Sequence, residues 1–163
     1  MKRIAINGFG RIGRSALKVI FDGSDLEVVG VNDLMDIENA VYLLKYDSNY
    51  GKYEKSIRFD GDTIFVGEKA IKYSSIREIE GLPWKQLDVD VVIESTGIFT
   101  SQTDAEKHIV AGAKSVVISG PTKDTPTVVH GVNTEKGNVS VFSCASCTTN
   151  NISPIIEILG RRV

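Results

Sequence analysis

Residues 4–14 read Ile-Ala-Ile-Asn-Gly-Phe-Gly-Arg-Ile-Gly-Arg, and this stretch decides the fold of the chain. It is typical of a short apolar strand, a turn with glycine at positions 8, 10 and 13, and a helix that opens near Gly10. Gly8 permits the tight turn, Gly10 lets the backbone approach a pyrophosphate, and Gly13 allows the helix to pack closely on the strand. The free N–H groups at the start of that helix would then hold a diphosphate.

A second predicted strand, residues 27–33, ends in an acid at the spacing that this pattern requires. Asp33 stands 20 positions after Gly13, where a carboxylate accepts a hydrogen bond from the ribose 2′-hydroxyl of a dinucleotide. The same carboxylate would repel a 2′-phosphate, and neither Leu34 nor Met35 supplies an arginine to bind one. We therefore expect NAD rather than NADP as the cofactor.

The composition is that of an ordinary globular domain. The chain has 163 residues, 42% of them hydrophobic and 25% charged, with a net charge of −2, which suits one domain with a small appendage. The absence of a basic block argues against nucleic acid or a membrane surface as the main partner. Two cysteines are too few for a disulfide framework, and the N-terminus lacks a signal-peptide layout, so we expect a cytoplasmic protein.

Strands and helices alternate along the rest of the chain, which predicts an α/β fold with a doubly wound, mostly parallel sheet, the Rossmann fold. Around Asp60-Gly61-Asp62, two short apolar runs predict a small antiparallel hairpin insertion. Further strands are expected at residues 56–59, 63–66, 70–73, 89–94, 115–118, 127–129 and 139–142, and helices at 36–46, 103–111 and after Cys147.

Ligands of such sheets bind beyond the carboxyl ends of the strands. We therefore expect one crevice lined by the strand exits at Asn7-Gly8, Asn32-Asp33, Ser95-Thr96-Gly97, Ser119-Gly120 and 143–147.

Three further expectations concern single positions. The first helix is expected to bury Ile12, Ala16, Leu17, Val19 and Ile20, and the last helix to carry Pro154 in its first turn, where proline is tolerated. His108 is expected on a helix surface and His130 in a loop. They lack the spacing of metal ligands, so no metal site is expected.

Cys147 stands where a strand ends and a helix begins, in Ser-Cys-Ala-Ser-Cys-Thr-Thr-Asn at 143–150. Backbone N–H groups and the positive end of the helix dipole favour a thiolate there. Beside a nicotinamide, such a thiolate can attack an aldehyde, giving a thiohemiacetal that becomes a thioester on hydride loss. A buried structural cysteine, or a redox dithiol with Cys144, is the alternative.

Four motifs together resemble glyceraldehyde-3-phosphate dehydrogenase, and the resemblance extends over the whole chain. They are 6–14 (Ile-Asn-Gly-Phe-Gly-Arg-Ile-Gly-Arg), 31–33 (Val-Asn-Asp), 94–100 (Glu-Ser-Thr-Gly-Ile-Phe-Thr) and 145–150 (Ala-Ser-Cys-Thr-Thr-Asn). The resemblance implies that Cys147 is the catalytic nucleophile, with Ser146 and Thr148 near the substrate. It also implies that Arg11, Ile12, Asp33, Arg77, Thr96, Gly97 and Ser119 surround NAD. A solvated surface residue is the alternative for Arg77.

The implied reaction converts glyceraldehyde 3-phosphate, NAD and inorganic phosphate into 1,3-bisphosphoglycerate and NADH, a step of glycolysis carried out by a homotetramer. Erythrose-4-phosphate dehydrogenase is a close alternative, and a non-catalytic NAD-binding module is a third. The family usually has asparagine at position 144 and often cysteine at 151, where this chain has Cys144 and Asn151. The sequence thus departs from the family in its thiols near Cys147.

The resemblance further implies a second domain that carries the histidine base and most of the phosphate-binding groups. We expect residues 1–147 to form the NAD-binding domain and 148–163 the start of the catalytic domain, as in a truncated chain. Such a chain is expected to bind NAD but to be inactive by itself.

Overall fold

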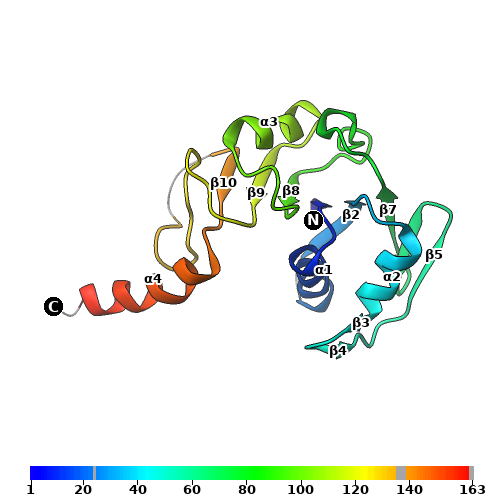
Figure 1. Ribbon diagram of the computed structural model, residues 1–163, viewed down its shortest axis with the longest axis horizontal. Coiled ribbons are helices and arrows are strands. Elements are labelled where there is room, and N and C mark those ends of the chain that lie inside the picture. The colour runs from blue at the N-terminus through cyan, green and yellow to red at the C-terminus, as the bar shows by residue number, and fades with distance from the viewer. Residues whose placement is uncertain (24, 135–138, 162–163) are drawn as a thin grey trace.

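The computed structural model describes residues 1–23, 25–134 and 139–161, and a single eight-stranded sheet organises them (Figure 1). Across the sheet the order is β10 (Val141–Ser143), β9 (Ser115–Ile118), β8 (Val91–Glu94), β1 (Lys2–Asn7), β2 (Leu26–Asn32), β7 (Lys69–Ser74), β6 (Thr63–Val66) and β5 (Ile57–Asp60). Strands β10 to β7 pair in parallel, whereas β7, β6 and β5 pair antiparallel.

The chain starts in the middle of this sheet and is wound outward in both directions. From β1 it passes through β2 to β7 on one side, then returns to β8, β9 and β10 on the other. This is the doubly wound order of a dinucleotide-binding sheet. The predicted fold class is therefore confirmed, and the hairpin insertion, β5 and β6, continues the main sheet beyond β7.

The described residues form four α-helices, of which the first three lie between strands and the fourth follows β10: α1 (Arg11–Gly23), α2 (Ile37–Lys45), α3 (Gln102–Val110) and α4 (Cys147–Gly160). Each of the last three has an N-cap side-chain oxygen that accepts a backbone N–H: Asp36 accepts from Asn39, Ser101 from Asp104 and Ser146 from Thr149. This satisfies a donor that the first turn leaves free. A short 3-10 helix, η1 (Ile79–Gly81), and a two-stranded antiparallel sheet, β3 (Tyr46–Asp47) with β4 (Gly51–Lys52), complete the fold.

The two faces of the sheet have separate apolar cores. Leu17 and Ile20 of α1 and Leu44 of α2 pack with Ile4 and Ile6 on one face. On the other face α3 and the segment around Trp84 cover a second cluster, whose members include Ala5, Val29, Trp84, Val92, Ala105 and Val116. Because neighbouring residues of β1 alternate between the clusters, the strand is buried on both faces, as parallel strands require.

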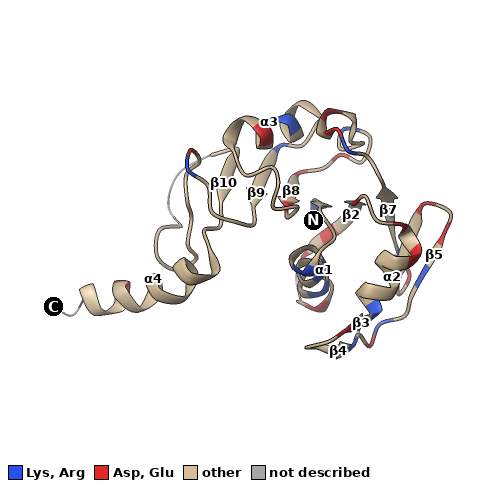
Figure 2. Cartoon of the chain, viewed as in Figure 1, with Lys and Arg blue, Asp and Glu red and all other residues tan. Residues whose placement is uncertain are grey.

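Helix α4 differs from the others because it has no buried residue. It extends away from the sheet and ends near the C-terminus (Figure 1). Glu157 is its one charged residue, so Figure 2 shows the helix almost entirely uncharged. Its apolar side chains are half exposed or more: Ile152, Ile155, Ile156, Ile158 and Leu159. Among the residues that the structure describes, no helix has the length and apolar character needed to cross a membrane.

Two expectations about helix positions are wrong. Ile12 and Val19 of α1 are 56% and 71% exposed, because the buried face follows Gly13, Leu17 and Ile20 with the helical period. Pro154 lies inside α4 rather than in its first turn, because capping by Ser146 starts the helix at Cys147. Proline in that interior position has no N–H for the carbonyl four residues earlier.

The predicted strand at 127–129 is also wrong. Thr127 makes an isolated bridge to Ser143, and Val128 donates its N–H to the Ser143 carbonyl at 2.8 Å. The next bond of a parallel ladder would come from the N–H of Ala145, which instead donates to the Ser143 hydroxyl at 2.9 Å. The pairing therefore stops after one residue.

Candidate dinucleotide-binding site

Two neighbouring cavities open at the carboxyl ends of the central strands. The larger, the first cavity, has a volume of about 470 Å³ and is lined by Asn7, Gly8, Gly10, Asn32, Asp33, Leu34, Ile76, Arg77, Glu78, Ser95, Thr96, Ile98 and Phe99. The second cavity, of about 240 Å³, is lined by Ile12, Glu94, Ser95, Thr96, Gly97, Phe99, Thr100, Ile118, Ser119 and Gly120. They share Ser95, Thr96 and Phe99 and lie where β1 meets β8, the point at which the winding direction reverses.

The three glycines of the opening turn differ in what surrounds them. Gly8 has φ +91°, and a Cβ there would lie 2.5 Å from the backbone nitrogen of Thr96. A Cβ on Gly13 would lie 2.2 Å from the carbonyl oxygen of Gly8, so α1 is pressed against the turn. A Cβ on Gly10, by contrast, would meet no protein atom within 4 Å. Packing within the chain therefore requires glycine at 8 and 13, whereas at 10 the open side faces the first cavity.

Asp33 lies in the first cavity directly beside the glycine turn. Its Oδ2 accepts the N–H of Phe9 at 2.5 Å and its Oδ1 accepts the N–H of Met35 at 2.9 Å. The carboxylate is thus held between the two strand exits by backbone donors from both, in a half-buried position. Arg77 is exposed and lines the same cavity, which places it at the rim rather than on an unrelated surface.

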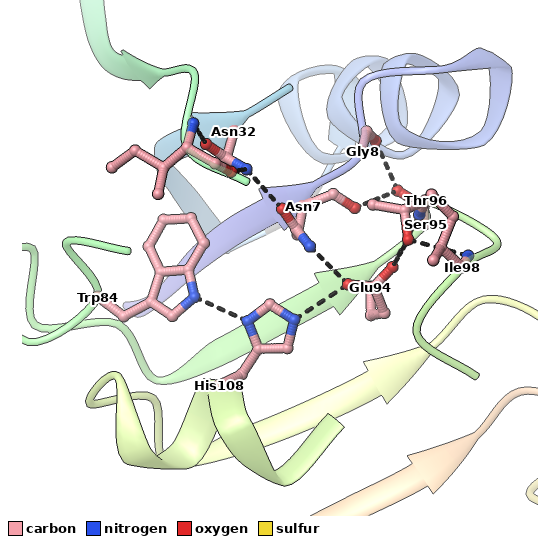
Figure 3. Close-up of polar contacts among 10 residues, drawn as sticks. Asn7, Gly8, Asn32, Trp84, Glu94, Ser95, Thr96, Ile98 and His108 are labelled. Carbon is pink, nitrogen blue, oxygen red and sulfur yellow. Dashed lines mark hydrogen bonds and ion pairs between the residues drawn. The ribbon is translucent and has the colours of Figure 1, made fainter. Parts of the chain in front are cut away.

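A buried polar network joins the central strands (Figure 3), and its members Asn7 and Asn32 also line the first cavity and Glu94 the second. Asn32 donates from Nδ2 to Oδ1 of Asn7 at 2.8 Å, and Asn7 donates from Nδ2 to Oε2 of Glu94 at 2.6 Å. From the other side, His108 Nε2 lies 3.0 Å from the same Glu94 oxygen, and Trp84 donates its indole N–H to His108 Nδ1 at 2.9 Å. These five side chains link β2, β1, β8, α3 and the segment before β8.

His108 corrects the sequence expectation. It is fully buried rather than on a helix surface, because α3 turns this position toward Trp84 and Glu94 in the second apolar core. An imidazole can be buried there because both ring nitrogens have partners. His130 is exposed in a turn, as expected. The described ranges contain no group of three or more histidine, cysteine, aspartate or glutamate side chains placed to hold a metal ion.

The other oxygen of Glu94 holds the loop that separates the two cavities. Oε1 accepts both the backbone N–H of Thr96, at 2.8 Å, and the Thr96 hydroxyl, at 2.5 Å. The hydroxyl oxygen of Thr96 in turn accepts the N–H of Ile98 at 3.1 Å. Ser95 donates its hydroxyl to the Gly8 carbonyl at 2.7 Å. The loop after β8 is therefore fastened to the glycine turn and to a buried carboxylate at once.

Cys147 is the first residue of α4 and is exposed. The loop before it is fixed: Ala145 has φ +66°, its N–H donates to the Ser143 hydroxyl at 2.9 Å, and Asn150 donates from Nδ2 to the Cys144 carbonyl at 2.7 Å. A left-handed conformation at a residue with a side chain is a strained one, typical of functional loops. Cys144 is half-buried, and burial raises the pKa of its thiol.

Some of the predicted site residues line the first cavity, some line the second, and some line neither. Gly8, Gly10, Asp33 and Arg77 line the first cavity; Ile12, Gly97 and Ser119 line the second; Thr96 lines both. Gly13 is buried under the turn, and Arg11 is exposed at the start of α1. Ser146, Cys147 and Thr148 line neither cavity, but the Ser143 hydroxyl donates at 2.7 Å to the carbonyl of Gly120, which lines the second cavity, so the exit at 143–147 begins beside it. Strand β10 lies beyond β9, about 10 Å from β8 at the usual strand spacing.

Sequence reasoning missed the network behind the cavities. Glu94 follows the apolar run at 91–93, and an acid at the last position of a buried strand is a signal that it has donors nearby. No comparable signal identifies His108 and Trp84 as its partners, because they are 24 residues apart and meet only when α3 packs on the sheet.

A family model described as "Glyceraldehyde 3-phosphate dehydrogenase, NAD binding domain" matches residues 2–102. The chain belongs to this family. The resemblance stated from its motifs is thereby confirmed. The matched residues include the glycine turn, Asp33 and the loop after Glu94, so the match covers the whole lining of the first cavity, whereas Ile118, Ser119 and Gly120 of the second lie beyond it.

Curated relatives carry the same name. "Glyceraldehyde-3-phosphate dehydrogenase, cytosolic" of Trypanosoma brucei brucei is 48% identical over 161 residues, which are 97% of this chain and 48% of that protein. The Streptomyces coelicolor enzyme is 49% identical over 162 residues, 96% of this chain and 48% of the relative. The Thermotoga maritima enzyme is 46% identical over 167 aligned positions, 99% of this chain and 50% of the relative. The chain thus spans about half the length of the curated relatives it matches.

Proposed function

We propose that this chain is the NAD-binding half of a phosphorylating glyceraldehyde-3-phosphate dehydrogenase that acts in glycolysis. The observation that carries the proposal is the first cavity, where Asp33 and the open side of Gly10 meet at the start of α1. Its volume of about 470 Å³ lies in the range of small-molecule and cofactor sites. Since a Cβ at Gly10 would meet no protein atom, the glycine there leaves room for a ligand group against the backbone.

The residues present fit a dinucleotide. We assign the pyrophosphate to the backbone N–H groups at the start of α1, near Gly10, Arg11 and Ile12, where the helix dipole favours an anion. We assign the adenosine ribose to Asp33, with Arg77 at the cavity rim. The second cavity, with Thr96, Gly97 and Ser119, lies on the side of the sheet nearer β10 and Cys147. We assign the nicotinamide end to it.

The chemistry that we propose for Cys147 is nucleophilic attack on an aldehyde. The thiolate sulfur adds to the carbonyl carbon of glyceraldehyde 3-phosphate, and the resulting alkoxide takes a proton to give a thiohemiacetal on Cys147. Oxidation of this adduct to a thioester releases the hydroxyl proton to a base and a hydride from the carbon, and bound NAD would supply the hydride acceptor. Inorganic phosphate then attacks the thioester carbon and releases Cys147 as a thiolate, with 1,3-bisphosphoglycerate as the product. The exposed position of Cys147 at the N-terminus of α4 supports the first step.

The described residues offer no general base beside Cys147. Both ring nitrogens of His108 are engaged in the buried network, and the chain's other histidine, His130, lies in an exposed turn. We therefore propose that the parent enzyme takes its base from the half of its relatives' length that this chain does not span. A polypeptide of these 163 residues alone would then be a non-catalytic NAD-binding module, which is the second candidate function.

We also propose a domain boundary at residue 147. Residues 1–147 form the NAD-binding domain and 148–163 begin the catalytic domain, of which residues 162 and 163 lie outside the described part. The absence of a buried residue in α4 supports this division, because a helix of the NAD-binding domain itself would place its apolar side on the sheet. By family resemblance we propose a homotetrameric parent enzyme. The cytoplasmic location is supported by free cysteines at 144 and 147.

Calorimetric titration with NAD and NADP tests the cofactor proposal. We expect binding of NAD to be at least about tenfold tighter, because the Asp33 carboxylate accepts from the ribose and repels a 2′-phosphate. Asp33→Asn keeps an oxygen for the Phe9 N–H but removes the charge, so it should shift the preference toward NADP by roughly tenfold, near 1.4 kcal/mol. The matched control is Glu38→Gln, which removes one negative charge from an exposed position of α2. Equal affinities in the unchanged chain would refute the role of Asp33.

A further inference from the structure

Glu94 is the junction of the buried network and accepts four hydrogen bonds. Its side chain is 1% exposed. Oε2 accepts from Asn7 and faces His108, while Oε1 accepts the N–H and the hydroxyl of Thr96. A carboxylate taken from water into a core must have such donors, because an unpaired one is very costly. Glu94 therefore has one arrangement in which both oxygens are satisfied, and that arrangement fixes the position of Thr96.

Trp84 decides which nitrogen of His108 carries the proton. An indole N–H can only donate, so His108 Nδ1 must accept it and carries no hydrogen. The neutral imidazole then has its proton on Nε2, from which it donates to Glu94 Oε2. Asn7 acts in the same direction from the other side, because its carbonyl oxygen accepts from Asn32 and its amide nitrogen must donate to Glu94. Asn7, His108 and Thr96 thus all donate to the carboxylate.

We propose that His108 and Trp84 are positioning residues for the dinucleotide, acting through Glu94 on Thr96. Neither side chain lines the cavities. The inference rests on the proposed function, because it concerns how the same site holds NAD. Trp84 and His108, which lie behind the cavities, thus set the geometry of the loop that separates the two cavities.

The loop has little freedom to move independently of the network. The space beside Gly8 is so tight that a Cβ would lie 2.5 Å from the Thr96 nitrogen, and Ser95 is bonded to the Gly8 carbonyl. If Glu94 changes its rotamer, the N–H and the hydroxyl of Thr96 both lose their acceptor. The contact of Thr96 with the glycine turn then changes too. Displacement of a binding group by a fraction of an ångström is enough to weaken a preorganised site. Through the same hydrogen bonds, binding of the dinucleotide should change the environment of the Trp84 indole.

Two amide substitutions at His108 separate its two contacts. In His108→Gln the amide nitrogen reaches the place of Nε2 and keeps the donor to Glu94, whereas in His108→Asn the amide oxygen reaches the place of Nδ1 and keeps the acceptor for Trp84. We expect NAD affinity, measured by calorimetry, to stay within about threefold in His108→Gln and to fall by about tenfold in His108→Asn, since only the asparagine variant loses the hydrogen bond to the charged Glu94. Thermal unfolding of both variants, followed by circular dichroism, gives their relative stabilities.

Rescue by His108→Gln distinguishes positioning from a structural role. If His108 only fills space, the two variants bind NAD equally once folded, or their affinities follow their melting temperatures, and either result overturns the proposal. Affinity retained by the glutamine variant and lost by an equally stable asparagine variant supports it. Failure of the unchanged chain to bind NAD would refute the proposed function itself, and the inference with it.

Trp84 supplies a second readout that needs no substitution in the core. It is the only tryptophan of the sequence, so fluorescence excited at long wavelength reports this one indole. We expect its emission to change on addition of NAD to the unchanged chain, with the same midpoint as the calorimetric titration. We expect the change to be smaller in Thr96→Val, which lacks the hydroxyl bonded to Glu94. Binding seen by calorimetry without any change in Trp84 emission would overturn the coupling while leaving the NAD site intact.

Discussion

Two regions of the molecule, the carboxyl ends of β1 and β8 and the helix that begins at Cys147, are built in opposite ways. At the strand ends, each polar side chain of the network has partners within the chain: Asn7, Asn32, Glu94 and His108 bond to one another or to the backbone. Along α4 the apolar side chains are exposed, and Ile156, for example, is 60% accessible. The first region has within the chain the contacts that the proposed NAD site needs. The second presents an exposed cysteine, and no described residue is placed to act with it.

This contrast shows which part of the proposed function resides in these residues. Cofactor binding needs backbone N–H groups, a carboxylate and a rigid loop, and local folding around one sheet provides all three. Oxidation of an aldehyde needs a base and substrate clamps close to the thiolate, held within tenths of an ångström. Nothing in the described residues holds such groups near Cys147. The NAD site can therefore be tested on this chain, whereas the chemistry must be tested on the parent enzyme.

The largest effect is expected in the glycine turn. In Gly13→Ala the new Cβ would lie 2.2 Å from the Gly8 carbonyl, so helix and turn must separate, and overpacking of this kind costs about 3 kcal/mol of unfolding free energy. In the matched variant Gly10→Ala the Cβ meets no protein atom, so we expect a loss of at most about 0.5 kcal/mol. Urea unfolding measures both.

NAD affinity separates these two variants in a second way. Gly10→Ala should bind NAD at least about tenfold more weakly although it is stable, because its methyl group occupies space against the backbone that we assign to the pyrophosphate. Equal NAD affinity in Gly10→Ala and the unchanged chain would show that the open side of Gly10 is not part of the site. The glycine turn would then no longer differ from the region around Cys147 in carrying a working site.

An effect of intermediate size is expected at the two cysteines. Under reducing conditions, iodoacetamide should label Cys147 at least about tenfold faster than Cys144, because Cys147 is exposed at a helix N-terminus whereas Cys144 is half-buried. Burial raises the pKa of Cys144, so its thiolate fraction stays small at neutral pH and its labelling should accelerate as the pH rises. Peptide mass spectrometry resolves the two sites.

The same samples show whether the exposed thiol turns over substrate. With glyceraldehyde 3-phosphate, NAD and phosphate we expect no increase in NADH absorbance from the 163-residue polypeptide, since no described group is placed to act as the base. Cys147→Ser serves as the blank. NADH formation that this substitution abolishes would mean that a group of these residues is the base, and the two regions would then be less different than we propose.

The smallest effect is expected on α4. Ile156→Ala should change the free energy of unfolding of this polypeptide by less than about 0.5 kcal/mol, because the side chain is mostly exposed. Leu17→Ala, in the fully buried core beneath α1, should cost about 3 kcal/mol. A loss in Ile156→Ala comparable with that in Leu17→Ala would show that α4 packs on a surface of this chain, or on a second copy, in solution.

The local patterns of the sequence were sufficient for the fold class and for half of the site. The glycine spacing, the acid at Asp33 and the alternation of strands and helices depend on neighbours in the chain, so they predicted β1, α1, β2 and the first cavity correctly. Helix ends were also predictable where a capping residue is present: Asp36 accepts the N–H of Asn39 as expected of an N-cap.

What the sequence could not predict depended on contacts between distant residues. Whether Ile12 is buried, and whether residues 127–129 extend a strand, was decided by which face of α1 meets the sheet and by the Ser143 hydroxyl, which takes the N–H of Ala145. Local alternation does not encode either choice. That Cys147 shares one crevice with the cavity residues stays a prediction, because shared strand polarity places the carboxyl ends of all parallel strands on one side of the sheet but not at one point along it.

The sequence by itself therefore determined that this chain has a doubly wound sheet with a dinucleotide turn, because these features follow from residues close together along the chain. Only the tertiary structure decided that Glu94 is joined to Trp84 through His108. The physical reason is that a carboxylate can be buried there only when donors from β1, α3 and the loop after β8 converge on it, and convergence is a property of packing.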